Sequence, residues 1–371
     1  MFHFVVAIPC LIVILRYLVP LKWPLWFKGL LSVALLLVAQ HHWLTLMAFG
    51  SMFSPEVPRA IVLIVNWIFG TMLFLAVFQL VVDAIALMLM AVKRRRVAIP
   101  SSLRYSMGAL ALGVAAFAVS QAARVPLVKD IEVTIQGLPS QFEGYEIVQL
   151  TDLHISRLFE APWVEAVVSQ ANALEPNLIV ITGDLIDGDL DLRRADVAPL
   201  QALSAPDGVY TIPGNHEYYF GYPQWMEYYQ SLGMQVLANQ HVVIDNEGAN
   251  LVLAGVTDFT AARHAFAAPN VEEAIAGAPS DSPIIMLDHQ PRNAVAAATA
   301  GVDLQLSGHT HGGMILGFDR LVASANNGFV SGFYNVQDMT LYVNNGTGLW
   351  PGFALRLGKP SELTRITLRQ G

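Results

Sequence analysis

The chain has 371 residues, of which 54% are hydrophobic and only 13% are charged, with a formal net charge of −8 and a single cysteine. This composition is too apolar for an ordinary soluble protein, and one cysteine excludes an internal disulfide. The charge is also segregated: residues 1–124 carry ten Lys/Arg and two acids, a net of about +8, whereas the remainder carries 11 Lys/Arg and 27 acids, about −16. We therefore expect a basic membrane portion followed by an acidic soluble portion. No nucleic acid is expected as a partner, because a phosphate backbone attracts Lys and Arg.

Four apolar stretches fill the first third of the chain, at about 3–19, 29–50, 60–91 and 105–122. The second and third are long enough to span a bilayer, and the first and fourth are short but adequate. A cleaved signal peptide is disfavoured because the first stretch lacks a basic n-region and further spans follow it. The sequence thus predicts an α-helical membrane region of about four spans over residues 1–124. A linker at 125–130 and a soluble domain at 131–371 are expected to follow.

The loops between these stretches predict an orientation. The basic residues gather in two loops, which hold Arg16, Lys22 and Lys28, and Lys93 to Arg96 with Arg104. The loop between the second and third stretches carries only Glu56 and Arg59. By the positive-inside rule the two basic loops are cytoplasmic, so the chain after residue 124 is expected outside. Residues 94–123 also resemble a twin-arginine export signal, which leads to the same side. We therefore expect a multi-pass inner-membrane protein with an extracytoplasmic, periplasmic domain.

A few polar residues lie within the apolar stretches. Asp83 is a functional candidate by default, because carboxylates inside a membrane are costly. An interfacial or salt-bridged structural role, with Lys93 about three helical turns away, is at least as well supported. His41 and His42 are expected to have packing or interfacial roles. Polar residues do not recur densely across the four stretches, so a transporter has little support.

After residue 130 one plan recurs, in which an apolar run is followed by residues that can bind a metal. The runs are Ile147 to Leu150 before Asp152 and His154, Leu178 to Ile181 before Asp184, Val209 to Ile212 before Asn215 and His216, Ile284 to Leu287 before His289, and Leu304 to Leu306 before His309 and His311. Near-continuous apolar runs are typical of strands buried on both faces, and ligands gather outside the carboxyl ends of such strands. Residues 161–174 and 292–300 have helical composition. The pattern predicts a layered α/β domain.

The polar residues at these strand ends predict a metal site. His309 and His311 lie at i and i+2 between glycines, and two neutral imidazoles aimed at one point suit a borderline metal such as Zn, Mn or Fe. Each motif alone is weak, because a strand-end Asp is often only a cap. Together, however, the candidate ligands exceed what one tetrahedral centre uses. The set is Asp152, His154, Asp184, Asn215, His289, His309 and His311, and we infer two divalent metal ions of the Mn, Fe or Zn class.

The order Asp-x-His, Gly-Asp, Gly-Asn-His-Glu, His and Gly-His-x-His resembles that of the calcineurin-like metallophosphoesterases, and the apolar N-terminal region resembles their membrane-anchored bacterial branch. The resemblance covers residues from about 131 to 371 and implies a four-layer α/β/β/α sandwich. It implies that one metal is held by Asp152, His154 and His311, the other by Asn215, His289 and His309, and that Asp184 bridges both. It also implies that His216 is an unligated imidazole that contacts the phosphate and protonates the leaving oxygen. Asp187 matches the carboxylate that orients this histidine in some members, although a solvated turn aspartate is nearly as well supported.

The expected function is that of a dinuclear metal-dependent phosphoester hydrolase. Two neighbouring cations can bind a bridging water, lower its pKa and neutralise charge on a phosphoryl group. The short tether to the membrane favours membrane lipids as partners, with a phospholipid or lipid-linked pyrophosphate as the substrate. The alternatives are a phosphodiesterase on a soluble nucleotide-type substrate and a non-catalytic metal-binding membrane sensor. His216 favours the enzyme, because a sensor has no use for a proton donor. The sequence leaves the oligomeric state open.

Overall fold

The structure, a computed structural model, describes residues 2–371, with side chains from residue 5 onward. The chain divides into two compact units. The helical unit comprises Met1–Ala122 together with Pro351–Leu355, and the α/β unit comprises Ala123–Trp350 and Arg356–Gly371. The sequence analysis assigned Pro351–Leu355, hereafter the inserted segment, to the soluble domain, whereas its contacts group it with the helices.

The helical unit is built from apolar helices, as expected for residues 1–124. They are α1 (Phe2–Ile12), which continues as a π-helical stretch (Val13–Leu18), α2 (Leu25–Ala39), α3 (His41–Phe49), α4 (Arg59–Lys93) and α5 (Ser101–Ala123). Among the described residues, α4 and α5 are long and apolar enough to cross a membrane, and α2 with α3, bent by 60°, form a candidate third span. The stretch Val5–Leu18 is a shorter apolar helix. The region is therefore helical and of membrane type, with two or three spans by length and composition.

The outer surface of these helices is apolar. Leu25 is 84% exposed and Trp26 72% on α2, and Leu87 is 63% exposed and Met88 65% on α4. Large contiguous apolar surfaces are rare on soluble monomers and mark contact with a membrane or another apolar partner.

Asp83 on α4 forms an ion pair within the helical unit. The guanidinium of Arg16 donates to both carboxylate oxygens at 3.0 Å, and Gln79 donates to one of them at 2.9 Å. Such bidentate pairing offsets much of the cost of placing a carboxylate among apolar helices. The partner is Arg16 and not Lys93, the nearer cation in sequence, because the π-helical stretch that carries Arg16 packs beside α4.

The strands of the α/β unit form two mixed sheets. The first sheet consists of β1 (Leu127–Ile135), β2 (Glu146–Leu150), β3 (Leu178–Ile181), β4 (Val209–Thr211), β5 (Gln235–Val236) and β12 (Glu362–Gln370); the second consists of β6 (Gln240–Asn246), β7 (Ala249–Gly255), β8 (Ile284–Leu287), β9 (Leu304–Ser307), β10 (Gly332–Val336) and β11 (Met339–Val343). In the first sheet the order is β1-β12-β2-β3-β4-β5, with β12 antiparallel to β2 and the other neighbours parallel. In the second the order is β10-β11-β9-β8-β7-β6, with a parallel centre and antiparallel edge pairs. The predicted α/β class is confirmed.

One apolar core lies between the two sheets. It contains fully buried side chains from both, such as Ile147 and Val180 of the first and Leu253, Ile285 and Leu306 of the second. Each such side chain contributes roughly 1.5–3 kcal/mol when it is removed from water. This core fixes β2 and β3 against β8 and β9, the strands whose ends carry the candidate metal ligands.

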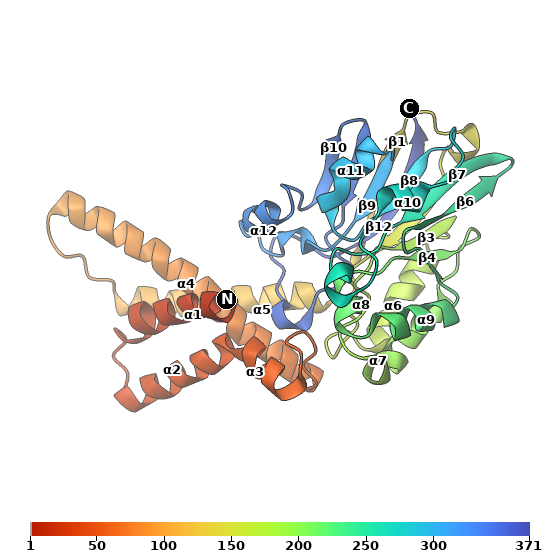
Figure 1. Cartoon of the computed structure of the whole chain (residues 1–371). Helices are drawn as coiled ribbons and strands as arrows, with labels where there is room; N and C mark the ends of the chain where they lie inside the picture. Colours follow the sequence, from red (N-terminus) through yellow and green to blue (C-terminus); the bar gives the residue numbers. More distant parts are fainter. Residues whose placement is uncertain (1) are drawn as a thin grey trace. The chain divides into compact units, whose positions relative to one another are not determined.

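Helices cover the outer faces of the sheets (Figure 1). A second core packs α10 (Val271–Ile275) and α11 (Ala294–Thr299) against β7, β8, β10 and β11. Figure 1 shows α6 (Ala161–Asn172), α7 (Leu190–Val197) and α9 (Tyr222–Ser231) beside β3 and β4. The short helices α8 (Asn215–Tyr219) and α12 (Asp319–Ala325) lie in loops. The segments with helical composition, 161–174 and 292–300, therefore contain α6 and α11.

Most of the linker expected at 125–130 is part of a β-strand in the structure. Strand β1 already begins at Leu127 and pairs in parallel with β12, so that Leu127 to Asp130 face Glu362 to Arg365. The charged residues of this stretch made it resemble a linker. In the structure Lys129 and Asp130 pair with side chains of β12. Lys129 lies 2.8 Å from Glu362, and Asp130 lies 2.8 Å from Arg365.

The inserted segment is held in the helical unit by polar side chains. Asn66 of α4 donates to the carbonyl of Pro351 at 2.8 Å and accepts the N–H of Ala354 at 2.7 Å. His42 of α3 donates to the carbonyl of Gly352 at 2.7 Å. The side chains of His42 and Asn66 thus provide hydrogen-bond partners for backbone C=O and N–H groups of the inserted segment. Without such partners, these backbone groups would be costly to bury among apolar helices.

Candidate metal centre

The candidate ligands lie directly after strands of both sheets. Asp152 and His154 follow β2, Asp184 follows β3 and Asn215 begins α8 after β4; His289 follows β8, and His309 and His311 follow β9. Hydrogen bonds join these loops: the N–H of Asp152 donates to the carbonyl of Gly183, and the N–H of Gly308 donates to that of His289. The strand ends of the two packed sheets therefore bring residues from distant parts of the chain to one place.

One group of ligand atoms comes from Asp152, His154 and His311, which lie within 4.8 Å of one another. The Nε2 atoms of His154 and His311 are 3.2 Å apart. The Nδ1 atom of His154 lies 3.1 Å from a carboxylate oxygen of Asp187. This contact places Nδ1 beside Asp187 and leaves Nε2 facing the other ligand atoms.

A second group comes from Asp184, His289 and His309, also within 4.8 Å of one another. The Nε2 atom of His289 lies 3.2 Å from Asp184 and 3.2 Å from the amide oxygen of Asn215. Its Nδ1 donates to the carbonyl of Thr182 at 2.8 Å, which directs Nε2 toward Asp184 and Asn215. Asp184 lies between the groups, because one of its oxygens is also 3.8 Å from Nε2 of His154.

His216 is close to both groups. Its Nε2 lies 3.9 Å from Asp184, and its Nδ1 makes a short contact with Asp187. It also lies within 4.8 Å of the ligand atoms of His154 and Asp184. Asp187 is therefore a buried carboxylate shared by His154 and His216, rather than a solvated turn residue.

The backbone at these residues is strained. Asp152, His154, Asp184, His309 and His311 all have positive φ, between 46° and 69°. Residues other than glycine rarely adopt this region, and such strain gathers at functional sites where the surroundings impose it. The strained backbone of these loops costs local stability, and it brings the candidate ligand side chains together.

Two glycines allow the loops to pack this closely. A Cβ atom at Gly214 would lie 2.2 Å from a carboxylate oxygen of Asp184, and one at Gly308 would lie 2.3 Å from Asp152. Only glycine fits at such close approaches. The glycines of the Gly-Asn-His-Glu and Gly-His-x-His motifs are therefore required by the packing around the carboxylates.

The charge distribution of the site suits divalent cations. Asp152, Asp184, Asp187 and Glu217 are all buried here, and buried carboxylates are costly unless cations offset them. Burial lowers the pKa of His309 to about 3, and burial also lowers the pKa of His311 well below its ordinary value. Both imidazoles are therefore neutral, which is the form that binds metals.

His216 has the opposite electrostatic environment. Burial lowers its pKa, but Asp184 and Asp187 outweigh burial and raise the pKa of His216 to about 9. Its imidazole is therefore held in the protonated form. This is the form that a general acid needs.

Comparison with known proteins agrees with this geometry. Residues 145–313 match the family described as "Calcineurin-like phosphoesterase". A "Transmembrane protein with metallophosphoesterase domain" from Danio rerio is 34% identical over 266 residues, which cover 69% of this chain and 60% of that protein. The metallophosphoesterase YkuE of Bacillus subtilis is 31% identical over 252 residues, which cover 66% of this chain and 86% of YkuE. The chain belongs to the calcineurin-like metallophosphoesterase family.

The similarity does not extend over the whole of the larger relatives. A "Transmembrane protein with metallophosphoesterase domain" from Bos taurus is 36% identical, over 67% of this chain and 58% of that protein. The chain thus spans about three fifths of the length of these two vertebrate relatives.

The structure adds Glu217 to the residues that build this metallophosphoesterase site. The sequence analysis quoted Glu217 in the Gly-Asn-His-Glu motif without a role. Its carboxylate accepts the N–H groups of Gly214 at 2.7 Å, Asp184 at 3.1 Å and Leu185 at 2.8 Å, and the hydroxyl of Tyr229 at 3.2 Å. Glu217 therefore fixes the loop of Asp184 against the loop of Asn215.

The Glu217→Gln variant should be less stable by about 2–3 kcal/mol. The amide NH₂ would face backbone N–H donors, and each buried polar group left without a partner costs about 1–3 kcal/mol. For a unit of this size the melting temperature should fall by roughly 5–10 °C, measured by thermal unfolding monitored by circular dichroism. Glu227→Gln, the same change at an exposed position of α9, is the matched control. Equal melting temperatures for both variants would contradict this role of Glu217.

A second addition is the fully buried Arg356. Its guanidinium donates to the carbonyls of His311 at 3.1 Å, Asn345 at 2.6 Å and Gly348 at 3.0 Å. Arg356 thus fixes the backbone of His311, one of the candidate metal ligands. The sequence offered no signal for this role, because Arg356 lies outside the motifs. It directly follows the inserted segment in the chain.

Proposed function

We propose that this metallophosphoesterase hydrolyses phosphoesters at a dinuclear divalent-metal centre. Asp152, His154 and His311 would hold one ion and Asn215, His289 and His309 the other, with Asp184 in contact with both. The observation that carries the proposal is the position of Asp184, whose carboxylate lies within ligand range of both histidine groups. A carboxylate can serve two ions at once because it has two oxygens with free lone pairs.

The protein residues would divide the chemistry between them. When bound, the two ions supply a water of lowered pKa and a clamp for the phosphoryl oxygens. His216, protonated at Nε2 and held at Nδ1 by Asp187, would donate a proton to the leaving oxygen. Asp187 would orient the ring and stabilise its charge, which makes it a positioning residue for His216.

The proposal predicts metal-dependent hydrolysis by the full chain purified in detergent. We expect turnover of bis(p-nitrophenyl) phosphate after loading with Mn²⁺, loss of turnover after chelation with EDTA, and recovery when Mn²⁺ is added back. The readout is p-nitrophenolate absorbance. Metal binding without turnover on aryl, alkyl or lipid phosphoesters would favour the non-catalytic sensor instead.

We further propose that the substrate is a lipid phosphoester or lipid-linked pyrophosphate. The support is the helical unit, whose apolar surface suits a bilayer, and β1, which begins only four residues after α5 ends. In the same assay, turnover in phospholipid–detergent mixed micelles should exceed turnover on a soluble diester with the same head group. Equal rates would favour a soluble nucleotide-type substrate.

For the membrane topology we propose four spans, with the α/β sandwich of four layers on the extracytoplasmic side of an inner membrane. The basic loops support this orientation. The inserted segment is bound at Asn66, which lies 27 residues before Lys93 on α4. This separation is about 40 Å along a helix, more than the roughly 30 Å of a hydrocarbon core. The inserted segment and the basic loop after Lys93 therefore belong to opposite membrane faces.

Reporter fusions test this topology. Alkaline phosphatase fused after Gly371 should be active, and a reporter that works only in the cytoplasm should be silent there. Fusions of the same two reporters after Arg96 should show the reverse pattern. A silent phosphatase after Gly371, with the fusion protein present by immunoblot, would contradict the proposed orientation.

A further inference from the structure

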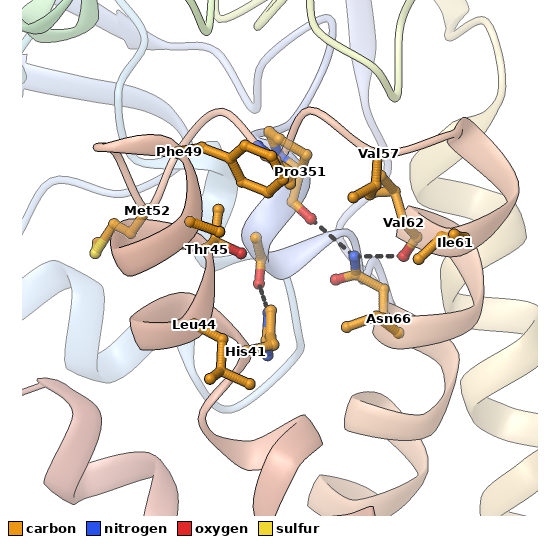
Figure 2. A pocket seen from close by; sticks show the side chains of 14 residues that line it. His41, Leu44, Thr45, Phe49, Met52, Val57, Ile61, Val62, Asn66 and Pro351 are labelled. Carbon is orange, nitrogen blue, oxygen red and sulfur yellow. Dashed lines mark hydrogen bonds between the residues drawn. The ribbon is translucent and has the colours of Figure 1, made fainter.

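The helical unit contains an apolar pocket of about 210 Å³ (Figure 2). Its walls come from α3, from the loop that follows it, from the first turns of α4 and from the inserted segment. The lining residues used below are Leu44, Ala48, Phe49, Ile61, Asn66 and Pro351. All of them belong to the helical unit, so the pocket is a feature of that unit alone.

Two polar side chains of the pocket, those of Asn66 and His41, are already engaged. The amide of Asn66 donates to the carbonyls of Val62 and Pro351 and accepts from Ala354. The ring nitrogens of His41 face the carbonyls of Val38 at 2.7 Å and Gly352 at 3.0 Å. Figure 2 shows the contacts of Asn66 and His41 with the backbone beside the apolar side chains. The pocket therefore presents apolar surface to an occupant, and apolar cavities do not hold water well.

The rim of the pocket continues into the exposed apolar surface of the helices. Leu44 is 38% exposed, Phe49 41% and Ile61 46%. This surface belongs to helices of membrane-spanning type. The pocket also lies where α4 begins at Arg59, next to the loop with Ser54 and Glu56, and such a junction of polar loop and apolar helix suits the boundary of a bilayer.

We propose that this pocket binds one acyl chain of a bilayer phospholipid. The surroundings favour this occupant, because the pocket opens onto the surface that lipid chains would cover and its walls are mostly apolar. A bound chain would contact Pro351 and so stabilise the inserted segment in its observed place. This lipid site goes beyond the proposed hydrolysis and does not require the bound lipid to be the substrate.

Photolabelling in a defined membrane tests the proposal. The full chain is reconstituted into vesicles of palmitoyl-oleoyl phosphatidylcholine that contain a phosphatidylcholine with a diazirine near the end of one acyl chain. After irradiation, labelled residues are identified by mass spectrometry. Labelling at residues 44–52 and 61–65 should exceed labelling at Leu87 and Met88, which are exposed on α4, by about tenfold. That ratio corresponds to about 1.4 kcal/mol, or roughly two buried methylene groups.

A matched pair of variants separates the pocket from general exposure. Ala48→Trp fills the pocket from an exposed position, and Ala109→Trp makes the same change at an exposed position of α5 that does not line it. Ala48→Trp should reduce pocket labelling about tenfold, whereas Ala109→Trp should leave it unchanged. Should Ala48→Trp fail to fold, the wild-type ratio of pocket labelling to Leu87 and Met88 labelling decides alone.

Three results would overturn the proposal: a wild-type ratio near one, equal pocket labelling in the folded variants, or crosslinks through the pocket to a second copy of the chain. Hydrolysis of bis(p-nitrophenyl) phosphate, measured on the same vesicles, keeps the two proposals apart. Turnover without pocket labelling rejects the lipid site only, and pocket labelling without turnover of aryl, alkyl or lipid phosphoesters by the Mn²⁺-loaded protein rejects the hydrolase only.

Discussion

The Asp184→Asn variant should lose bound metal and turnover together. The amide keeps the shape of the side chain but removes the charge that faces both ligand groups, so at least one ion should be depleted. We expect hydrolysis to fall by roughly a thousandfold or more, since losing about 4 kcal/mol of metal-centred stabilisation of the transition state corresponds to that factor. The measurements are metal content by elemental analysis and turnover of bis(p-nitrophenyl) phosphate.

Asp189→Asn is the matched control for this variant. Asp189 precedes α7 in an exposed position, five residues along the chain from Asp184. The same loss of charge there should leave metal content and turnover unchanged. If Asp184→Asn bound as much metal as Asp189→Asn and hydrolysed as fast, Asp184 could not be the shared ligand.

The His216→Ala variant should keep both metals and lose proton donation. Removal of a general acid typically costs about 10²–10⁴ in rate, and an alkyl phosphoester should show this full loss because its leaving group needs a proton. A p-nitrophenyl ester should show a much smaller loss, because p-nitrophenolate hardly needs protonation. The measurement is turnover on both ester types alongside elemental analysis, with His264→Ala as an exposed histidine control.

The pattern of the His216→Ala result distinguishes its possible roles. His216 lies within ligand range of Asp184 and His154, so metal loss in this variant would identify it as a ligand instead of an acid. Equal impairment on both esters with full metal content would mean that His216 positions the phosphate. Only a leaving-group-dependent loss agrees with proton donation.

The positions of the strands that carry the site were predictable from the sequence. The run Leu178 to Ile181 coincides with β3, and Ile284 to Leu287 with β8. Strands buried on both faces need continuous apolar side chains, so few other structures fit these short apolar runs. Because ligands collect at the carboxyl ends of such strands, the residues that follow them were candidates before the structure was known.

The contacts that support the site were not predictable, because they depend on which loops meet in space. Glu217 and Arg356 act on backbone groups of Asp184 and His311, and no local pattern marks a side chain for a distant carbonyl or N–H. The same holds in the helical unit. His42 and Asn66 serve a segment that lies about 285 residues or more further along the chain, so the sequence analysis could assign His42 only to packing or the membrane interface.

The most direct test of the central claim is the number and coupling of metals in the full chain. We would load the purified protein with Mn²⁺, remove unbound ions, and record metal content together with the electron paramagnetic resonance spectrum. Two manganese ions per chain with a spin-coupled signal are the predicted result, and Asp184→Asn should lose at least one of the ions together with the spin-coupled signal. One ion per chain, or two ions with the spectrum of isolated Mn²⁺, would contradict a dinuclear centre bridged by Asp184.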